Sequence, residues 1–295
     1  MSLSKTLQSP EVLQQIFGKS LLEIRQLFLG IGNVWYEENP EEENQIRENL
    51  EALGITFDNQ IVASIKENII YHYAEKVLPL AGSAEHFSTF LDIHVDSTEA
   101  KSLITEAQKK GGVLIATPHF GGVELVVPTI ARMGVNANAV LKFSTQNLSD
   151  KARAFADNMC STGLFAPISF IELGKPNSNG ALEMAAALRR GEVLFTVFDE
   201  ETGYSVPANL FGKTVEGGSG LDKLLKFAGA SVTAYNVFMI RTGEDTFKMQ
   251  LVPVDLTSEN PIQIMYNNLE VILREHLEQW YFLHEEIPFI ENVDK

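Results

Sequence analysis

The chain has 295 residues and carries 23 lysines and arginines against 39 aspartates and glutamates, which gives a formal net charge of −16. Apolar residues make up 45% and charged residues 21%, a composition that is typical of a folded globular protein and argues against disorder. Because a surface with this charge repels phosphate groups, we expect no binding to nucleic acid and at most peripheral contact with a membrane.

The cysteine content and the hydropathy of the sequence indicate the cellular compartment and exclude some kinds of site. The single cysteine, Cys160, excludes an intrachain disulfide framework and a cysteine-rich metal site. The sequence shows no secretory signal, and charged residues interrupt its longest apolar stretch, 20–36, so we expect a packed helix there and no membrane span. These features favour a cytoplasmic protein, with peripheral contact at the inner membrane left open.

The first hundred residues show helical periodicity. We expect one helix that begins after Pro10 and extends to Phe28, followed by an acidic break. A second helix is predicted to end at Gly54. A third is predicted to begin at Asp58, a favourable N-cap residue, and to end at Pro79.

From about residue 111, short runs rich in valine, isoleucine and phenylalanine alternate with helical stretches. The predicted strands are 113–118, 136–143, 167–173, 193–199, 231–241 and 247–254, and the predicted helices are 123–133, 149–160, 180–190, 219–229 and 261–284. This alternation predicts an α/β fold with a mixed, mostly parallel sheet flanked by helices. We expect an N-terminal helical region, 1–105, to pack on an α/β domain, 106–295.

The most informative stretch, 113–125, predicts a strand, a tight turn and the start of a helix. It places His119 at the end of the strand, where Glu124 is expected to accept a hydrogen bond from the imidazole and stabilise the imidazolium. The backbone N–H groups of Gly121 and Gly122 are candidates for an oxyanion site. Such a dyad suits proton abstraction from a hydroxyl, although a structural histidine beside a surface glutamate is the competing interpretation.

Other sequence motifs suggest one possible phosphate site and argue against several classes of enzyme. Gly218 and Ser219 precede a predicted helix and are candidates for binding a phosphate, but we favour a flexible turn in which Ser219 caps the helix. The remaining histidines show no ligand spacing, so no metal site is expected. The sequence lacks the Gly-x-Ser-x-Gly elbow of serine hydrolases and the glycine-rich loops that bind dinucleotides or nucleoside triphosphates.

The stretch 111–125 resembles the His-x4-Asp/Glu block of the lysophospholipid and glycerolipid acyltransferase superfamily, and more narrowly its bacterial lipid A late-acyltransferase branch, which transfers lauroyl and myristoyl chains. Four further blocks resemble that branch in the same order, namely 47–50, 188–203, 206–212 and 280–284. Each block is short and weak alone, but the ordered set covers nearly the whole chain.

The resemblance implies an acyltransferase in which His119 deprotonates a hydroxyl or amine and Glu124 orients the ring. The implied donor is an acyl thioester, either acyl-CoA or acyl-carrier protein, with no resident cofactor, and the implied acceptor is a lipid or a soluble metabolite. Asp199 and Glu201 match acidic positions of the family and are expected to position substrate, with solvated loop carboxylates as the alternative.

Basic residues and departures from the family pattern bear on the two substrates. Lys142 stands where the family has an arginine, and Arg241 matches a family arginine, so both are candidate substrate anchors. The expected membrane anchor and basic surface are missing, and Thr202 replaces a tyrosine, which favours a different, soluble acceptor. A thioesterase-type hydrolase on the same scaffold and a non-catalytic acyl-chain-binding protein stay open as alternatives.

Overall fold

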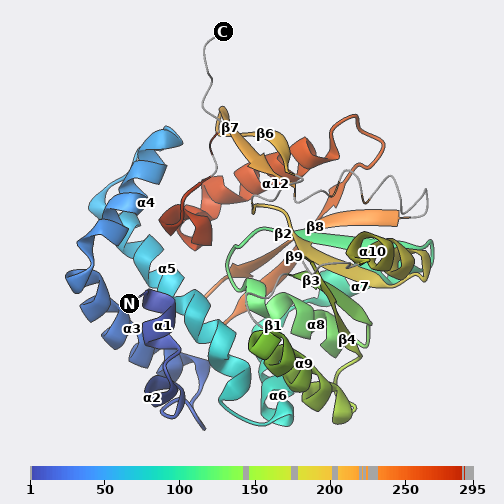
Figure 1. The fold of residues 1–295 in the computed structure, drawn as a ribbon, viewed down its shortest axis with the longest axis horizontal. Helices are drawn as coiled ribbons and strands as arrows, with labels where there is room; N and C mark the ends of the chain where they lie inside the picture. The colour runs from blue at the N-terminus through green and yellow to red at the C-terminus, as the bar shows by residue number, and fades with distance from the viewer. Residues whose placement is uncertain are drawn as a thin grey trace.

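The computed structural model describes residues 2–141, 146–173, 179–200, 205–218, 221, 224, 232–287 and 289. A layer of helices at the N-terminus packs beside an α/β core (Figure 1). The helices up to residue 108 are α1 (Leu3–Leu7), α2 (Pro10–Leu13), α3 (Leu21–Glu38), α4 (Pro40–Ala52), α5 (Asn59–Val77), the 3₁₀ helix η1 (Leu78–Leu80), α6 (Ala84–His94) and α7 (Thr98–Gln108).

Local capping decides where the N-terminal helices begin and end. The Asp58 carboxylate accepts hydrogen bonds from the first backbone N–H groups of α5, which confirms the predicted start of that helix. Gly54 follows α4 with a φ of 71°, a conformation that favours glycine. The single helix predicted from Pro10 to Phe28 is wrong, because Ser20 and Glu23 form a capping box that starts α3 as a separate helix.

Seven strands form the central sheet in the order β1-β9-β8-β2-β5-β3-β4. Their bounds are β1 (Val95–Asp96), β2 (Gly112–Thr117), β3 (Ala137–Leu141), β4 (Ile168–Glu172), β5 (Val193–Val197), β8 (Val232–Arg241) and β9 (Phe247–Val254). The five strands from β8 to β4 run parallel, whereas β9 is antiparallel to β8. The predicted mixed, mostly parallel sheet is therefore confirmed.

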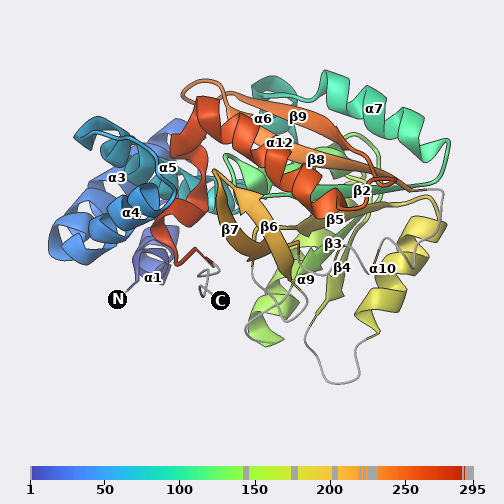
Figure 2. The same cartoon turned by 90° about the horizontal axis from the view of Figure 1, so that it is seen from above.

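The remaining helices cover the sheet on both sides. They are the 3₁₀ helix η2 (Val123–Leu125), α8 (Val126–Arg132), α9 (Gln146–Ser161), α10 (Gly180–Arg189) and α12 (Pro261–His276), followed by the 3₁₀ helices η3 (Leu277–Gln279) and η4 (Tyr281–His284). In Figure 1, α12 lies on one side of the sheet and α8 and α9 lie on the other, and Figure 2 shows α12 running across the sheet.

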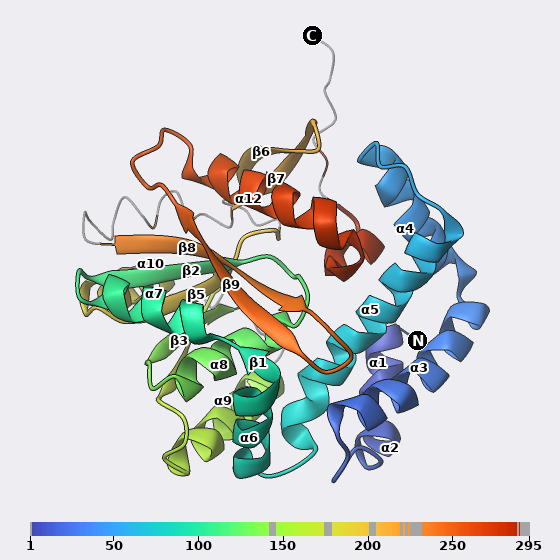
Figure 3. The ribbon, with the colours of Figure 1, turned by 180° about the vertical axis from the view of Figure 1, so that it is seen from behind.

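Three further features differ from the sequence-based expectation. The sheet begins with β1, and residue 105 lies inside α7, which packs on β2 and β9. A hairpin of β6 (Val206–Leu210) and β7 (Lys213–Gly217) was not predicted, and it rests on α12 (Figure 3). The helix predicted over 261–284 ends at His276, because Trp280 is extended and forms a backbone bridge to Phe120.

The predicted helix 219–229 and the end of the predicted strand 136–143 lie largely outside the described residues. No helix in the described ranges is both long enough and apolar enough to cross a lipid bilayer.

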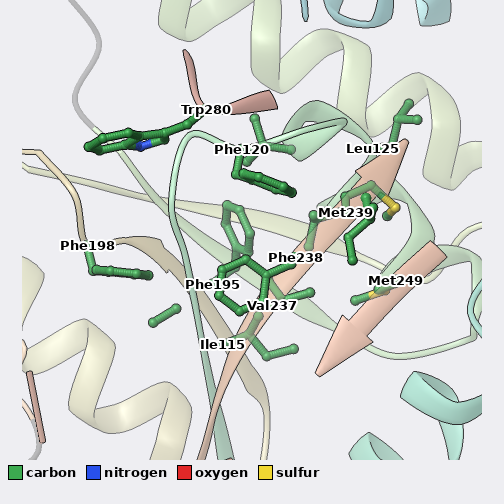
Figure 4. Packing of buried hydrophobic residues seen from close by; sticks show 14 of the residues in the cluster. Ile115, Phe120, Leu125, Phe195, Phe198, Val237, Phe238, Met239, Met249 and Trp280 are labelled. Atoms are coloured by element: carbon green, nitrogen blue, oxygen red, sulfur yellow. The ribbon is translucent and has the colours of Figure 1, made fainter. Parts of the chain in front are cut away.

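One contiguous apolar core runs from the N-terminal helices through the sheet to α12. Near the end of β2, the ring of Phe120 packs edge to face on Phe238 of β8, with centroids 5.9 Å apart, and Trp280 lies beside Phe120 (Figure 4). The C-terminal segment 277–284 is thereby fixed against the end of the sheet.

Replacing Phe238 with alanine should lower the free energy of unfolding by about 3–5 kcal/mol, because the ring is fully buried and its removal leaves a cavity. Urea denaturation followed by circular dichroism measures the change. The matched control is Phe17→Ala, whose ring is 79% exposed and whose loss should cost no more than about 0.5 kcal/mol. Equal effects of the two substitutions would contradict the placement of Phe238 in the core.

Candidate active site

His119 and Asp199 meet at the carboxyl edge of the parallel sheet. Thr117, the last residue of β2, is the register partner of Val197, the last residue of β5, so the residues two positions beyond each strand emerge side by side. The Nδ1 atom of His119 lies 2.9 Å from Oδ1 of Asp199, and the backbone N–H of His119 donates to Oδ2 at 2.8 Å. One carboxylate therefore fixes both the ring and the backbone of the histidine.

Trp280 completes the environment of the Asp199 carboxylate. Its indole Nε1–H donates to Oδ2 of Asp199 at 3.1 Å, and the carboxylate is almost fully buried. A buried charge of this kind is tolerated because three donors satisfy it. Trp280 was not predicted as a site residue, although it begins the family-like block 280–284.

The C-terminal segment also holds the histidine itself. The backbone N–H of Tyr281 donates to the carbonyl of His119 at 2.9 Å. The ring of Phe282 packs edge to face against the imidazole with centroids 5.0 Å apart. The His119 side chain keeps 21% exposure, so the ring is held on several sides and stays accessible from solvent.

The electrostatic surroundings of His119 favour its protonated form. Burial lowers the pKa of the imidazole, but the charge and hydrogen bond of Asp199, with the charges of Glu200 and Glu124, outweigh burial and raise that pKa above its ordinary 6.5. In the neutral ring, Nδ1–H donates to Asp199 and Nε2 carries the lone pair. Nε2, the ring nitrogen that does not contact Asp199, lies 3.4 Å from Oε1 of Glu200.

Glu124 contacts α5. Its Oε1 atom lies 3.3 Å from Nζ of Lys76 and 3.6 Å from Nε2 of His72. The predicted hydrogen bond between Glu124 and the His119 ring is wrong, because η2 turns Glu124 toward α5. Asp199 accepts the hydrogen bond from the ring instead. Glu124 acts on the pKa of His119 as a neighbouring charge, and its part in catalysis stays a prediction.

The charge of Glu124 and burial shift the pKa values of the neighbouring side chains. The charge of Glu124 raises the pKa of the Lys76 ammonium, which favours the charged form of that side chain. Burial lowers the pKa of His72 well below its ordinary value, and the charge of Lys76 adds to that effect. His72 is therefore a neutral ring behind the site.

Gly121 and Gly122 hold the turn after His119 close to β8. The N–H of Gly121 donates to the carbonyl of Gln279 at 2.9 Å, and that of Gly122 donates to the carbonyl of Met239 at 2.8 Å. The prediction that these N–H groups form an oxyanion site is therefore corrected. Gly121 has a φ of 55°, and a Cβ there would lie 2.0 Å from the Met239 carbonyl oxygen, so the position requires glycine for packing.

Arg241 is buried beneath this turn. Its guanidinium binds both carboxylate oxygens of Glu75 at 2.7 and 2.8 Å, and it donates to the carbonyl of Gly121 at 2.8 Å and to Asn68 at 3.0 Å. Glu75 is fully buried and also accepts from Arg25 at 2.6 Å. The prediction that Arg241 anchors substrate is corrected, because its donors are used inside the protein.

The other predicted substrate-binding residues contribute less. The N–H of Gly218 donates to the carbonyl of Phe198 at 2.7 Å, so it is occupied by the backbone and the phosphate interpretation is corrected at this residue. Lys142, Glu201 and Ser219 lie outside the described residues. Within the described part of the chain, no group of three or more histidine, cysteine, aspartate or glutamate side chains is arranged to hold a metal ion.

A narrow apolar hollow adjoins the buried side of Asp199. It is lined by Asp199, Leu210, Val215, Glu216, Tyr266, Trp280, Phe282 and Ile287, and its volume is about 10 Å³. That volume is close to the least that holds one water molecule, so the hollow is closed in this conformation. An open groove of about 1010 Å³ between residues 53–58 and α12 includes neither His119 nor Asp199.

Comparison with known proteins adds one finding. A model of the bacterial lipid A biosynthesis acyltransferase family matches residues 24–287, which include most of α3, the helices after it, the sheet and the segment around Trp280. No curated protein sequence matches the chain.

Replacing Asp199 with asparagine should lower the pKa of His119, because the charge that raises this pKa is removed while burial, which lowers it, is retained. Titration of the His119 ring by NMR measures the shift. Glu259→Gln is the control, since that exposed carboxylate follows β9 at the opposite edge of the sheet. An unchanged His119 pKa in the Asp199 variant would contradict the pairing.

Proposed function

The chain belongs to the bacterial lipid A biosynthesis acyltransferase family, and we propose that it transfers an acyl chain from an acyl thioester to a hydroxyl or amine, with His119 as the general base. One observation supports this role above the others. At the carboxyl edge of the sheet, the imidazole is held at Nδ1 by a buried carboxylate, which leaves Nε2 as the nitrogen for proton transfer, and the side chain stays 21% exposed.

The proposed reaction begins with neutral His119. As the acceptor oxygen attacks the thioester carbonyl, its proton moves to Nε2, and Asp199 stabilises the imidazolium through the Nδ1–H hydrogen bond. The tetrahedral intermediate then collapses and the carbon–sulfur bond breaks. The leaving thiolate takes the proton from Nε2, which yields an ester, a free thiol and the neutral ring.

The raised pKa of His119 has two consequences for this reaction. It makes the imidazole a stronger base toward the acceptor hydroxyl, but it also leaves a smaller fraction of the enzyme in the neutral, reactive form at pH 7. We therefore expect kcat/KM to increase with pH until the ring has lost its proton, with a midpoint above 6.5.

We propose that the first carbons of the acyl chain enter the hollow beside Asp199. Its walls are mainly aromatic and aliphatic, as an alkyl chain requires, and it is next to the proposed base. Entry requires its side chains to move apart, because the hollow is closed without substrate. Acyl-CoA and acyl-carrier protein stay alternative donors, and no resident cofactor is needed, because the thioester already carries the activated acyl group.

We further propose that the reaction takes place in the cytoplasm or at the surface of the inner membrane, with a soluble or weakly membrane-associated acceptor. The charge of −16 supports this choice, since anionic lipid would repel the protein as a whole.

Hydrolysis of the thioester is the second candidate function. The His119 side chain is 21% exposed, so water can reach Nε2 and replace the acceptor as nucleophile. Acyl-CoA incubated with and without an alcohol separates the two reactions, because transfer gives an ester and hydrolysis gives the free acid in both samples.

Replacing His119 with alanine should lower thioester turnover by a factor of about 10²–10⁴, the usual contribution of a general base. Release of free CoA and formation of the acyl product, followed by liquid chromatography, measure the loss. His86→Ala is the matched control, because His86 is exposed on α6. Wild-type turnover in the His119 variant would contradict the proposed function.

The two carboxylates near His119 should differ in their effects on kcat. Asp199→Asn removes the group that orients the ring and is expected to lower kcat by up to about 10⁴-fold. Glu124→Gln removes a charge that does not touch the ring and should have a much smaller effect. Steady-state kinetics of the two variants side by side test this order. A larger loss of kcat in the Glu124 variant would support the His119–Glu124 dyad expected from the sequence.

A further inference from the structure

Glu200 lies beside the atom that receives the proton in the proposed reaction. Its Oε1 atom is 3.4 Å from Nε2 of His119, and its side chain is 49% exposed. Two hydrogen-bond acceptors, one of them a carboxylate, therefore lie side by side on the accessible face of the site. Any acceptor whose nucleophile reaches Nε2 must also meet this carboxylate.

The surrounding charges strengthen the negative potential at this point. The charges of Asp199, Glu200 and Glu124 all raise the pKa of His119. The Lys76 ammonium lies 3.3 Å from Glu124 and is balanced by it. A phosphate placed next to Nε2 would be repelled here, whereas an ammonium group would be stabilised.

The contact with Glu200 is not needed to hold the ring. Asp199 already fixes His119 through two hydrogen bonds, and it is buried, whereas Glu200 is half exposed. Ion pairs at such exposure contribute little to stability. The ring therefore stays in place if the Glu200 carboxylate turns from Nε2 to a substrate.

We infer that Glu200 determines acceptor specificity by binding an ammonium group adjacent to the hydroxyl that is acylated. This inference rests on the proposed acyl transfer. A vicinal amino alcohol presents two donors in the same direction, so its hydroxyl can donate to Nε2 while its ammonium donates to Oε1 of Glu200. The hydroxyl is the group that reacts, because an ammonium held by a carboxylate keeps its proton and has no lone pair.

The test compares two small acceptors with the same carbon skeleton, serinol and glycerol, which differ in carrying an ammonium or a hydroxyl group on the central carbon. The full-length protein is incubated with a labelled acyl-CoA, and total acyl transfer is counted as ester plus amide, since an ester beside a free amine rearranges. The wild type is expected to prefer serinol in kcat/KM by about tenfold or more, as one charge-assisted hydrogen bond allows.

Three variants make the test specific. Glu200→Gln keeps the shape and removes the charge, so the preference for serinol should fall to near unity. Glu200→Asp keeps the charge and should retain part of the preference. Glu259→Gln removes the same charge at the opposite edge of the sheet and should leave the preference unchanged.

Each outcome has a distinct meaning. Equal use of serinol and glycerol by the wild type, or a preference that survives Glu200→Gln, would overturn the inference while the acyltransferase function stands. An equal loss of preference in the Glu259 variant would assign the effect to overall charge and overturn it as well. If the wild type acylates neither of the two alcohols and also leaves the thioester intact, the proposed function and the inference are both wrong.

Discussion

The carboxylate of Asp199 is the interaction on which the rest of the site depends. It accepts hydrogen bonds from the backbone of His119, from the His119 ring and from the indole of Trp280. The donors come from two separate parts of the chain, the turn after β2 and the segment after α12, and the carboxylate that joins them is on a third, the loop that follows β5. A buried charge needs all of its hydrogen-bond partners, so the Asp199 carboxylate fixes the positions of the three segments relative to one another.

A second buried carboxylate, Glu75, has the same effect beneath the site. It pairs with Arg25 from α3 and with Arg241 at the end of β8, and Arg241 in turn binds the carbonyl of Gly121. Removing one partner of such a cluster typically costs about 3–5 kcal/mol, because the remaining charges are left buried without balance. The turn that carries His119 is therefore supported from below by the N-terminal helices.

Periodicity and capping residues were sufficient to predict most of the fold. The runs that became β2, β5, β8 and β9 are apolar and rich in β-branched or aromatic residues, and Asp58 marked the start of α5. The break after His276 was not predicted, because it depends on the contact of Trp280 with Phe120, which is distant in the sequence. The β6–β7 hairpin pairs two neighbouring segments, and it was not predicted because Pro207 and the polar residues of both strands give only a weak strand pattern.

The candidate site was predicted in part for the same reason. His119 was found from its position at the end of a strand, but its partner was sought nearby in the sequence, at Glu124. Spacing along one segment cannot show that η2 turns Glu124 toward α5, nor that the neighbour of β2 in the sheet is β5. The sequence did contain a sign of this pairing, because His119 and Asp199 follow the ends of their apolar runs by the same number of residues. This sign points to a contact only if the two strands are taken as parallel neighbours.

The burial of Glu75 has a consequence for how this protein is assembled. Two guanidinium groups, one from an N-terminal helix and one from the central sheet, share a single counter-ion that water does not reach. Arg25 and Glu75 both lie in the N-terminal helices, whereas Arg241 has no counter-ion of its own in the sheet, so the α/β core depends on the helical layer to balance that arginine. A polypeptide that starts at the first long strand would bury Arg241 without a counter-ion, and this would oppose folding at the turn that carries His119.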